Sequence, residues 1–115
     1  MPNLTTNHRR LGPISILDLR GSITLGETSV AFRHAIRDLV DCGQIKIILN
    51  LSNVNSMDSA GVGELAGAYM PLKSRGGELK FLNPTKKIQG ILQITQLDKV
   101  FQVYTDEQMA IRSFS

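Results

Sequence analysis

The spacing of apolar residues along the chain alternates between a strand pattern and a helix pattern. Residues 14–19 are mostly apolar, lie between Gly12-Pro13 and Gly21, and predict a strand. Residues 45–51 are nearly all apolar and rich in β-branched side chains, which is typical of an inner strand covered on both faces. Residues 78–82 repeat the strand pattern. These three segments predict the centre of a sheet.

Weaker signals predict strands at the two ends of the chain. Residues 4–11 can pair with residues 14–19 across a Gly-Pro turn, although most of them are polar. We therefore expect residues 1–10 to form either a flexible tail or an edge strand. Residues 100–103, Val-Phe-Gln-Val, predict a short last strand. The sheet should then have four to five strands.

Helical spacing separates these strands. Residues 27–42 place apolar side chains every three to four positions, which makes one apolar helical face. A second helix should begin near Ser59 and end at Gly76-Gly77. It should kink or change register over residues 67–71, because Pro71 removes a backbone donor and clashes with the preceding turn.

Capping signals predict two more helices in the last third of the chain. Asn83 is expected to cap one of them, with Pro84 in its first turn. Thr105 followed by Gln108 has the form of a capping box and predicts a final helix. Strands alternating with helices imply right-handed crossovers. The expected fold is an α/β domain in which a mixed sheet packs against about four helices.

Length and composition limit the chain to a single domain. Its 115 residues are 42% apolar and 20% charged, which is typical of one globular unit, so residues 1–115 should fold together. The net charge of +3 is spread along the chain, without a long basic run or basic strands that also carry aromatic residues. Nucleic acid is therefore not an expected partner.

Signals for disulfides, metals, secretion and membranes are missing from the sequence. Cys42 is the only cysteine, so an intrachain disulfide or a cysteine metal cluster cannot form. Residues 1–10 lack the apolar stretch of a signal peptide, and no apolar run is long enough to span a membrane. We expect a cytoplasmic protein without metal, cofactor or membrane contact.

Residues that would support catalysis do not group together. His8 and His34 lie far apart, one in a polar tail and one on a helix face, so a histidine relay has no evident partner. Gly61 and Gly63 lack the third glycine of a dinucleotide fingerprint, and no Gly-Lys-Ser/Thr phosphate loop occurs. The chain is therefore not expected to be an enzyme.

The most informative segment follows the strand at residues 45–51 and reads Asp-Ser-Ala-Gly-Val-Gly over residues 58–63. It places Ser59 at a helix N-terminus, where backbone N–H groups and the helix dipole favour a phosphate. The simplest interpretation is that Asp58 caps the helix and Ser59 is merely its first residue. However, glycines in a first turn cost about 1 kcal/mol each relative to alanine. They are typical where another backbone comes close, which favours a docking surface with a modifiable hydroxyl.

With this motif the chain resembles the STAS-domain anti-sigma factor antagonists, also called anti-anti-sigma factors. Residues 49–51 followed by residues 57–63 look like the family's strand, its Asp-Ser-Ser/Thr-Gly-Leu-Gly turn and its helix start. Gly21, the Gly76-Gly77 turn and the order of elements extend the resemblance over nearly the whole chain. The resemblance implies a single STAS domain.

The resemblance also implies a partner switch. In this family the unphosphorylated antagonist binds an anti-sigma factor that is a serine kinase of the GHKL ATPase type, and so frees the sigma factor. The kinase phosphorylates the serine after the aspartate, here Ser59, and a PP2C-type phosphatase resets it. The implied partner-binding residues are Gly21, Ser22, Thr24, Asp58, Ser59, Ala60, Gly61 and Gly63.

Three positions depart from the family pattern. The family's Gly-Glu-Leu/Ile-Asp after the second strand is Gly-Ser-Ile-Thr at residues 21–24, so two acids expected near the partner surface are absent. Ala60 replaces the second hydroxyl residue, which leaves Ser59 as the sole acceptor within Asp-Ser-Ala-Gly. Pro71 changes the far end of the same helix.

Two other functions stay open at this point. One is a STAS accessory subunit of a lipid ABC transporter or another regulatory assembly, in which Ser59 is a plain cap. Loss of its hydroxyl would then change only stability, by about 0.5 to 2 kcal/mol. The other is ligand sensing, for which the sequence has no pocket-forming signal. The oligomeric state is also left open.

Overall fold

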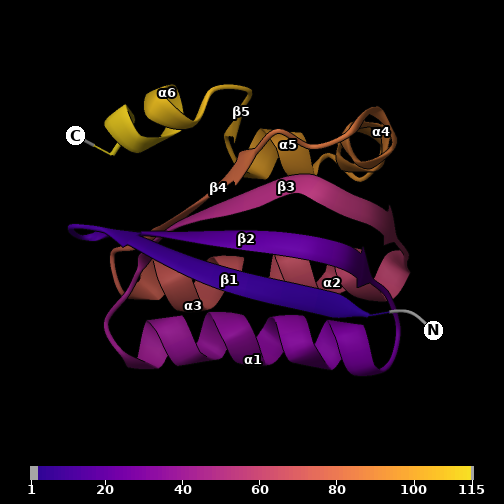
Figure 1. Ribbon diagram of the computed structural model, residues 1–115, viewed down its shortest axis with the longest axis horizontal. Coiled ribbons are helices and arrows are strands. Elements are labelled where there is room, and N and C mark those ends of the chain that lie inside the picture. The colour runs from indigo at the N-terminus through magenta and orange to yellow at the C-terminus, as the bar shows by residue number, and fades with distance from the viewer. Residues whose placement is uncertain (1–2, 115) are drawn as a thin grey trace.

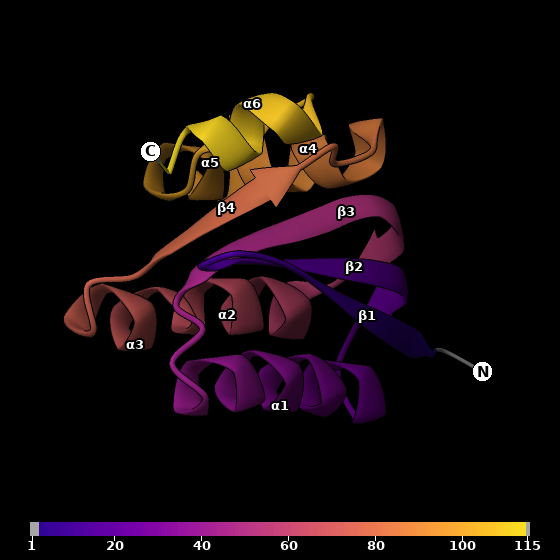
Figure 2. The same ribbon diagram turned by 60° about the vertical axis from the view of Figure 1, so that its left-hand side comes forward.

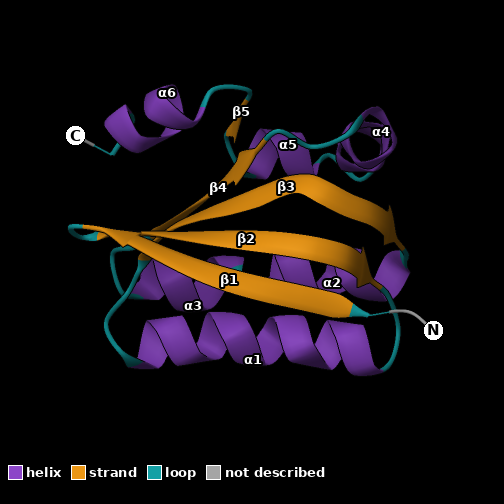
Figure 3. Ribbon diagram, in the orientation of Figure 1, coloured by secondary structure: helices purple, strands orange, loops and turns teal. Residues whose placement is uncertain are grey.

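Strands and helices alternate along the chain, and the structure, a computed structural model, describes residues 3–114. Figure 1 shows the arrangement of these elements, and Figure 3 shows it by type of secondary structure. In chain order they are β1 (Leu4–Leu11), β2 (Ile14–Ile23), α1 (Glu27–Asp41), β3 (Lys46–Met57), α2 (Ser59–Gly67), α3 (Tyr69–Ser74), β4 (Glu78–Leu82), α4 (Lys86–Ile94), α5 (Leu97–Val100), β5 (Val103–Tyr104) and α6 (Glu107–Arg112).

The five strands form one mixed sheet in the order β1-β2-β3-β4-β5. Strand β1 pairs antiparallel with β2, from Leu11 opposite Ile14 to Leu4 opposite Gly21, and the other neighbours are parallel. The α/β class and the mixed sheet are therefore as predicted. Of the two possibilities for the N-terminus, the edge strand is confirmed for residues 4–11, and residues 1–2 lie outside the described part.

The two faces of the sheet carry separate apolar cores. On one face, alternate side chains such as Leu49 and Phe81 pack with residues of α1 to α5, among them Phe32. On the other face, a smaller cluster joins Ile16 and Ile48 to α6. In Figures 1 and 2, α1, α2 and α3 lie on the opposite side of the sheet from α6. Strand β3 is thus covered on both faces, as its apolar run predicts.

Strands β2 and β3 are longer than predicted, and this extension positions the candidate site. Residues 52–57 lie beyond the predicted strand, but they continue β3 and pair with β2 as far as Met57 opposite Ile23. Val54 and Met57 are buried and Asn55 is exposed, and the pairing with β2 contains two register shifts in this region. Polar residues are stable there because water solvates the outer face of the strand. The two parallel strands consequently end side by side.

The helix after β4 begins later than predicted. Thr85 is its cap, and its hydroxyl accepts a hydrogen bond from the Ile88 N–H at 3.3 Å. Asn83 instead has a φ of 53° and donates its N–H to the Tyr104 carbonyl at 2.8 Å. The prediction of an Asn83 cap with Pro84 in the first turn is therefore wrong, because Asn83 is needed to pair with β5.

The C-terminal segment also differs from the prediction. Asp106, and not Thr105, caps α6, because its Oδ1 accepts from the N–H groups of Gln108 and Met109. The strand expected over residues 100–103 is wrong over most of its length, since α5 ends at Val100 and β5 begins at Val103. The capping box is thus replaced by an aspartate cap one residue later.

Six helices are present among the described residues, where about four were predicted. One extra helix arises because the second predicted helix divides at Ala68, where α2 ends and α3 begins. This division confirms the change expected over residues 67–71. The short α5 is the other addition. Within residues 3–114, no helix combines the length and apolar content that a membrane crossing needs.

Candidate functional site

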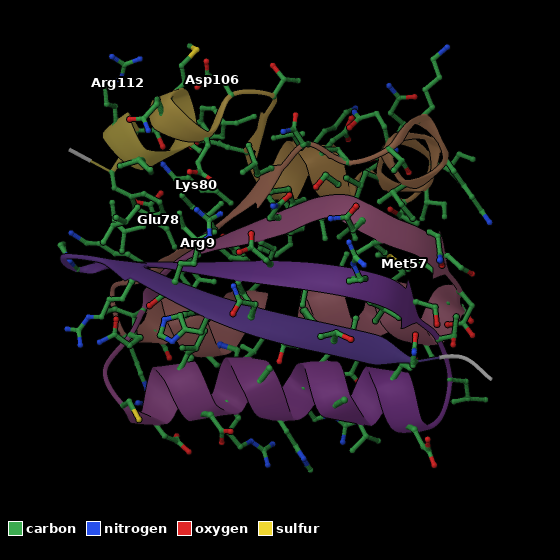
Figure 4. All side chains as sticks on the ribbon, in the orientation of Figure 1. Arg9, Met57, Glu78, Lys80, Asp106 and Arg112 are labelled. Atoms are coloured by element: carbon green, nitrogen blue, oxygen red, sulfur yellow. The ribbon has the colours of Figure 1, made fainter. Side chains whose placement is uncertain are left out.

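The Asp-Ser-Ala-Gly-Val-Gly motif lies at the end of β2 and β3. Strand β3 ends at Met57, Asp58 follows, and α2 begins at Ser59. Figure 4 labels Met57 at this end of the sheet. Because β2 ends opposite Met57, the loop of residues 24–26 that follows β2 lies beside the start of α2. The parallel pairing of β2 and β3 therefore brings the motif next to the loop that follows β2.

The Asp58 carboxylate joins these two loops. Its Oδ1 accepts a hydrogen bond from the Gly61 N–H at 3.0 Å, which confirms the predicted N-cap of α2. Its Oδ2 accepts a second one from the Leu25 N–H, also at 3.0 Å. These hydrogen bonds, first that from Leu25 and then that from Gly61, lower the pKa of Asp58 because they stabilise its charged form. Asp58 is thus an anion at neutral pH.

Ser59 is the first residue of α2 and is exposed. Within residues 3–114 its hydroxyl has no hydrogen-bond partner, so it is open to solvent and to another protein. Ala60 is half-buried, and Gly63 is exposed, with no atom within 4 Å of where its Cβ would lie. The residues that follow Ser59 are small, and its hydroxyl is accessible.

Another backbone does come close to Gly61, as the glycine predicts. Gly61 is buried, and a Cβ at this position would overlap the carbonyl oxygen of Ile23 and lie 2.7 Å from the Cγ of Met57. The neighbouring backbone is the end of β2 in the same chain. The glycine therefore allows α2 to pack closely against the sheet.

Burial separates the other predicted partner-binding residues into two groups. Gly21 and Ser22 are buried, and the Ser22 N–H donates to the carbonyl of Asn3 at 2.9 Å. The buried Ser22 hydroxyl has no partner among the described residues. Thr24 is half-buried and lies in the loop beside Asp58. Among these three residues, Thr24 has the side-chain surface that a direct partner contact requires.

An ion pair between α1 and α2 borders the motif. Arg33 Nη2 lies 2.7 Å from Glu64 Oε2, and Arg33 Nε donates to Glu64 Oε1 at 3.1 Å. This pair raises the pKa of Arg33 through hydrogen bonding and charge attraction. The sequence pattern does not reveal this bridge, because the two residues are 31 positions apart.

Leu25 is the second feature that the sequence did not single out. It is 81% exposed, although it is a large apolar side chain. It lies in the loop next to Asp58, directly before Gly26, which has a φ of 110°. The signal in the sequence that could have pointed to Leu25 is an apolar residue inside a short loop that ends in glycine.

Cofactor and metal chemistry find little support in the described part of the chain. Residues 3–114 contain no group of three or more His, Cys, Asp or Glu side chains that could hold a metal. An open hollow of about 440 Å³ lies between α1 and the α2–α3 pair, with Phe32, Arg37 and Arg75 among its lining residues. It is separate from the exposed serine.

A comparison with models of protein families identifies the family of this chain. The STAS domain model matches residues 5–110. This chain belongs to the STAS domain family. Among curated relatives of this STAS domain, an anti-sigma F factor antagonist of Paenibacillus polymyxa is 31% identical over 65 residues, which cover 56% of each protein. The STAS domain thus matches little more than half the length of such relatives, 56% to 59%.

Solved structures agree on the fold. An anti-sigma factor antagonist from Mycobacterium paratuberculosis superposes with a TM-score of 0.86 at 24% identity, over 96% of this STAS domain and 93% of that chain. The phosphorylated form of the Bacillus cell fate determinant SpoIIAA gives 0.74 at 22% identity, over 96% and 100% of the two chains. At these identities the likeness shows a shared fold.

Proposed function

We propose that this STAS domain is an anti-sigma factor antagonist that works by partner switching. The unphosphorylated form binds an anti-sigma serine kinase of the GHKL type and so releases a sigma factor. Phosphorylation of Ser59 reverses this, and a PP2C-type phosphatase restores the binding form. The observation that carries the proposal is that Ser59 is exposed at the first position of α2. The names of the curated relatives support the proposal, which also places the protein in the cytoplasm.

The proposed contact surface consists of the exposed or half-buried residues of the motif and its neighbouring loop. They are Thr24, Asp58, Ser59, Ala60 and Gly63. Gly21, Ser22 and Gly61 lie beneath this surface and shape it through their backbones. A partner that covers the Ser59 hydroxyl must therefore approach the common end of β2 and β3.

The charge of a phosphate explains how modification would break the contact. Phosphoserine carries a charge of about −1.5 to −2 at neutral pH, and here it would follow the ionised Asp58 directly. Enclosing both anions in an interface costs several kcal/mol, and about 2.8 kcal/mol is a hundredfold in affinity. In the free protein, the N-terminus of α2 stabilises the same phosphate. The fold itself need not change.

Phosphate mapping tests the proposal. The purified protein is incubated with ATP and each GHKL-type serine kinase of its organism, and the phosphate is located by mass spectrometry. We expect phosphate on Ser59, and none on Ser59→Ala, which should still bind the kinase. Ser74→Ala, at an exposed serine in the last turn of α3, is the matched control and should be phosphorylated like the wild type.

Binding measurements complete the test. The phosphorylated protein should bind the kinase at least tenfold more weakly, and Ser59→Asp should also bind more weakly, since it adds one negative charge. Equal affinities for these forms and the wild type would contradict the proposal, as would phosphate on Ser56 or Thr95. Co-purification with an ATPase subunit of a lipid transporter, together with a purely structural effect of Ser59→Ala, would favour the accessory-subunit function instead.

A further inference from the structure

An exposed leucine stands beside the proposed phosphorylation site. Leu25 is 81% exposed, and its backbone N–H is bound by the same carboxylate that caps α2 at Ser59. Single exposed apolar residues are common on protein surfaces. What distinguishes Leu25 is the way in which its loop is held.

Hydrogen bonds fix the loop from two sides. The Asp58 Oδ2 accepts the Leu25 N–H at 3.0 Å. On the other side, the Thr28 hydroxyl accepts from the Thr24 N–H at 2.9 Å and donates to the Thr24 carbonyl at 3.0 Å. The Ser29 N–H also donates to that carbonyl, at 3.0 Å. The backbone that leads into Leu25 is therefore held in place before any partner binds, which reduces the entropy lost on binding.

Hydroxyl residues stand where the family pattern has acids, and an apolar residue follows them. Residues 21–24 contain no acid, and Thr24 and the next residue, Leu25, reach the surface beside Asp58. A partner that covers Ser59 comes close to the Leu25 backbone, because one carboxylate accepts hydrogen bonds from both loops. Burying a leucine side chain strengthens binding by roughly tenfold to a hundredfold.

We propose that Leu25 is an apolar anchor that inserts into an apolar pocket of the protein partner that covers Ser59. Asp58 acts through it as a positioning residue, because its carboxylate holds the Leu25 backbone. This inference rests on the proposed function for the identity of the partner as a serine kinase. The inference adds a partner contact at Leu25 and a positioning role for Asp58, neither of which follows from the serine motif alone.

The first test measures the affinity of Leu25→Ala for the kinase that phosphorylates Ser59. We expect binding at least tenfold weaker than wild type, with Leu25→Met close to wild type. The matched control is Met109→Ala, since Met109 is also exposed, at 56%, and belongs to α6, which packs on the opposite face of the sheet from α1 and α2. Wild-type affinity of Leu25→Ala would overturn the inference while leaving phosphorylation at Ser59, and with it the proposed function, intact.

A double-mutant cycle tests the positioning role of Asp58. Asp58→Asn exchanges one acceptor oxygen for an amide group, so one of the two hydrogen bonds is lost, and binding should weaken. Asp58 also lies on the proposed contact surface, so the double variant should bind more weakly than Leu25→Ala alone, but by less than the sum of the two separate losses. Additive losses would overturn the positioning role. Thermal unfolding of each variant checks that α2 remains folded. If no serine kinase binds the wild type, the inference and the proposed function both fail.

Discussion

Two glycines in the first turn of α2 have opposite surroundings. A Cβ on Gly61 would overlap the Ile23 carbonyl, whereas one on Gly63 would meet no atom within 4 Å. Neither glycine has a positive φ that would exclude alanine. Space alone therefore decides what each position tolerates.

Exchanging each glycine for alanine tests this difference. Gly61→Ala should lower the free energy of unfolding by about 1 to 3 kcal/mol, because the methyl group forces α2 away from the end of β2. Gly63→Ala should raise it by about 0.4 to 1 kcal/mol, because alanine restricts the unfolded chain and favours the helix. Urea unfolding measures both. Equal effects of the two substitutions would contradict the packing described here.

Helix α6 is attached to the sheet by contacts of charged side chains as well as by its small apolar cluster. The Nε of Arg9 in β1 lies 2.6 Å from Asp18 Oδ2, and its Nη2 lies 2.7 Å from Glu107 Oε1. Figure 4 labels Arg9 on the sheet. Beneath α6, the buried Lys80 Nζ donates to the Ser113 hydroxyl at 2.6 Å and lies 4.2 Å from the ring centroid of Phe114. The attachment of α6 therefore depends on residues far away in the sequence.

Removal of the Arg9 side chain should loosen α6 before the rest of the fold. Arg9→Ala should destabilise the protein by about 1 kcal/mol, since the bridges are partly exposed to solvent. Hydrogen exchange should rise first in residues 107–112. Arg10→Ala is the neighbouring control, because Arg10 is exposed and donates from Nε to the Gly12 carbonyl. Equal exchange in α6 of both variants would show that the apolar cluster alone holds this helix.

At the scale of the whole molecule, two aspartates make stability depend on pH. The hydrogen bond from Arg9 is the main cause that lowers the pKa of Asp18, and a bond from Asn50 adds to it. The pKa of Asp58 is lowered by N–H groups of Leu25 and Gly61. Asp18 links three strands and Asp58 links two loops. A group whose pKa is lower in the folded state stabilises the fold at pH values above its unfolded pKa.

Stability should therefore be nearly constant from pH 7 to about 5 and fall as the pH drops below about 4, the ordinary pKa of aspartate. The loss should continue down to the lower pKa values of the folded protein. The Asp18→Asn/Asp58→Asn variant should be less stable at pH 7 and show a shallower decline. Urea midpoints measured between pH 7 and pH 3 test this. A wild-type midpoint that rises on acidification would contradict it.

The sequence by itself determined the features that depend on near neighbours. The apolar runs at residues 14–19 and 78–82 lie in strands, as does the run at residues 45–51 apart from Ile45, and residues 27–41 form a helix. The Asp58 cap and the helical start at Ser59 were likewise predictable. Periodicity and capping act over three or four residues, so a single chain displays them without knowledge of its fold.

Only the tertiary structure decided which distant groups meet. It assigned the cap of α4 to Thr85, because Asn83 pairs with β5. It placed Gly61 against the end of β2, and it bound Leu25 to a carboxylate 33 positions away. The parallel pairing of β2 and β3 creates this meeting point. Side-chain contacts of this kind depend on strand register, which residue spacing along the chain does not encode.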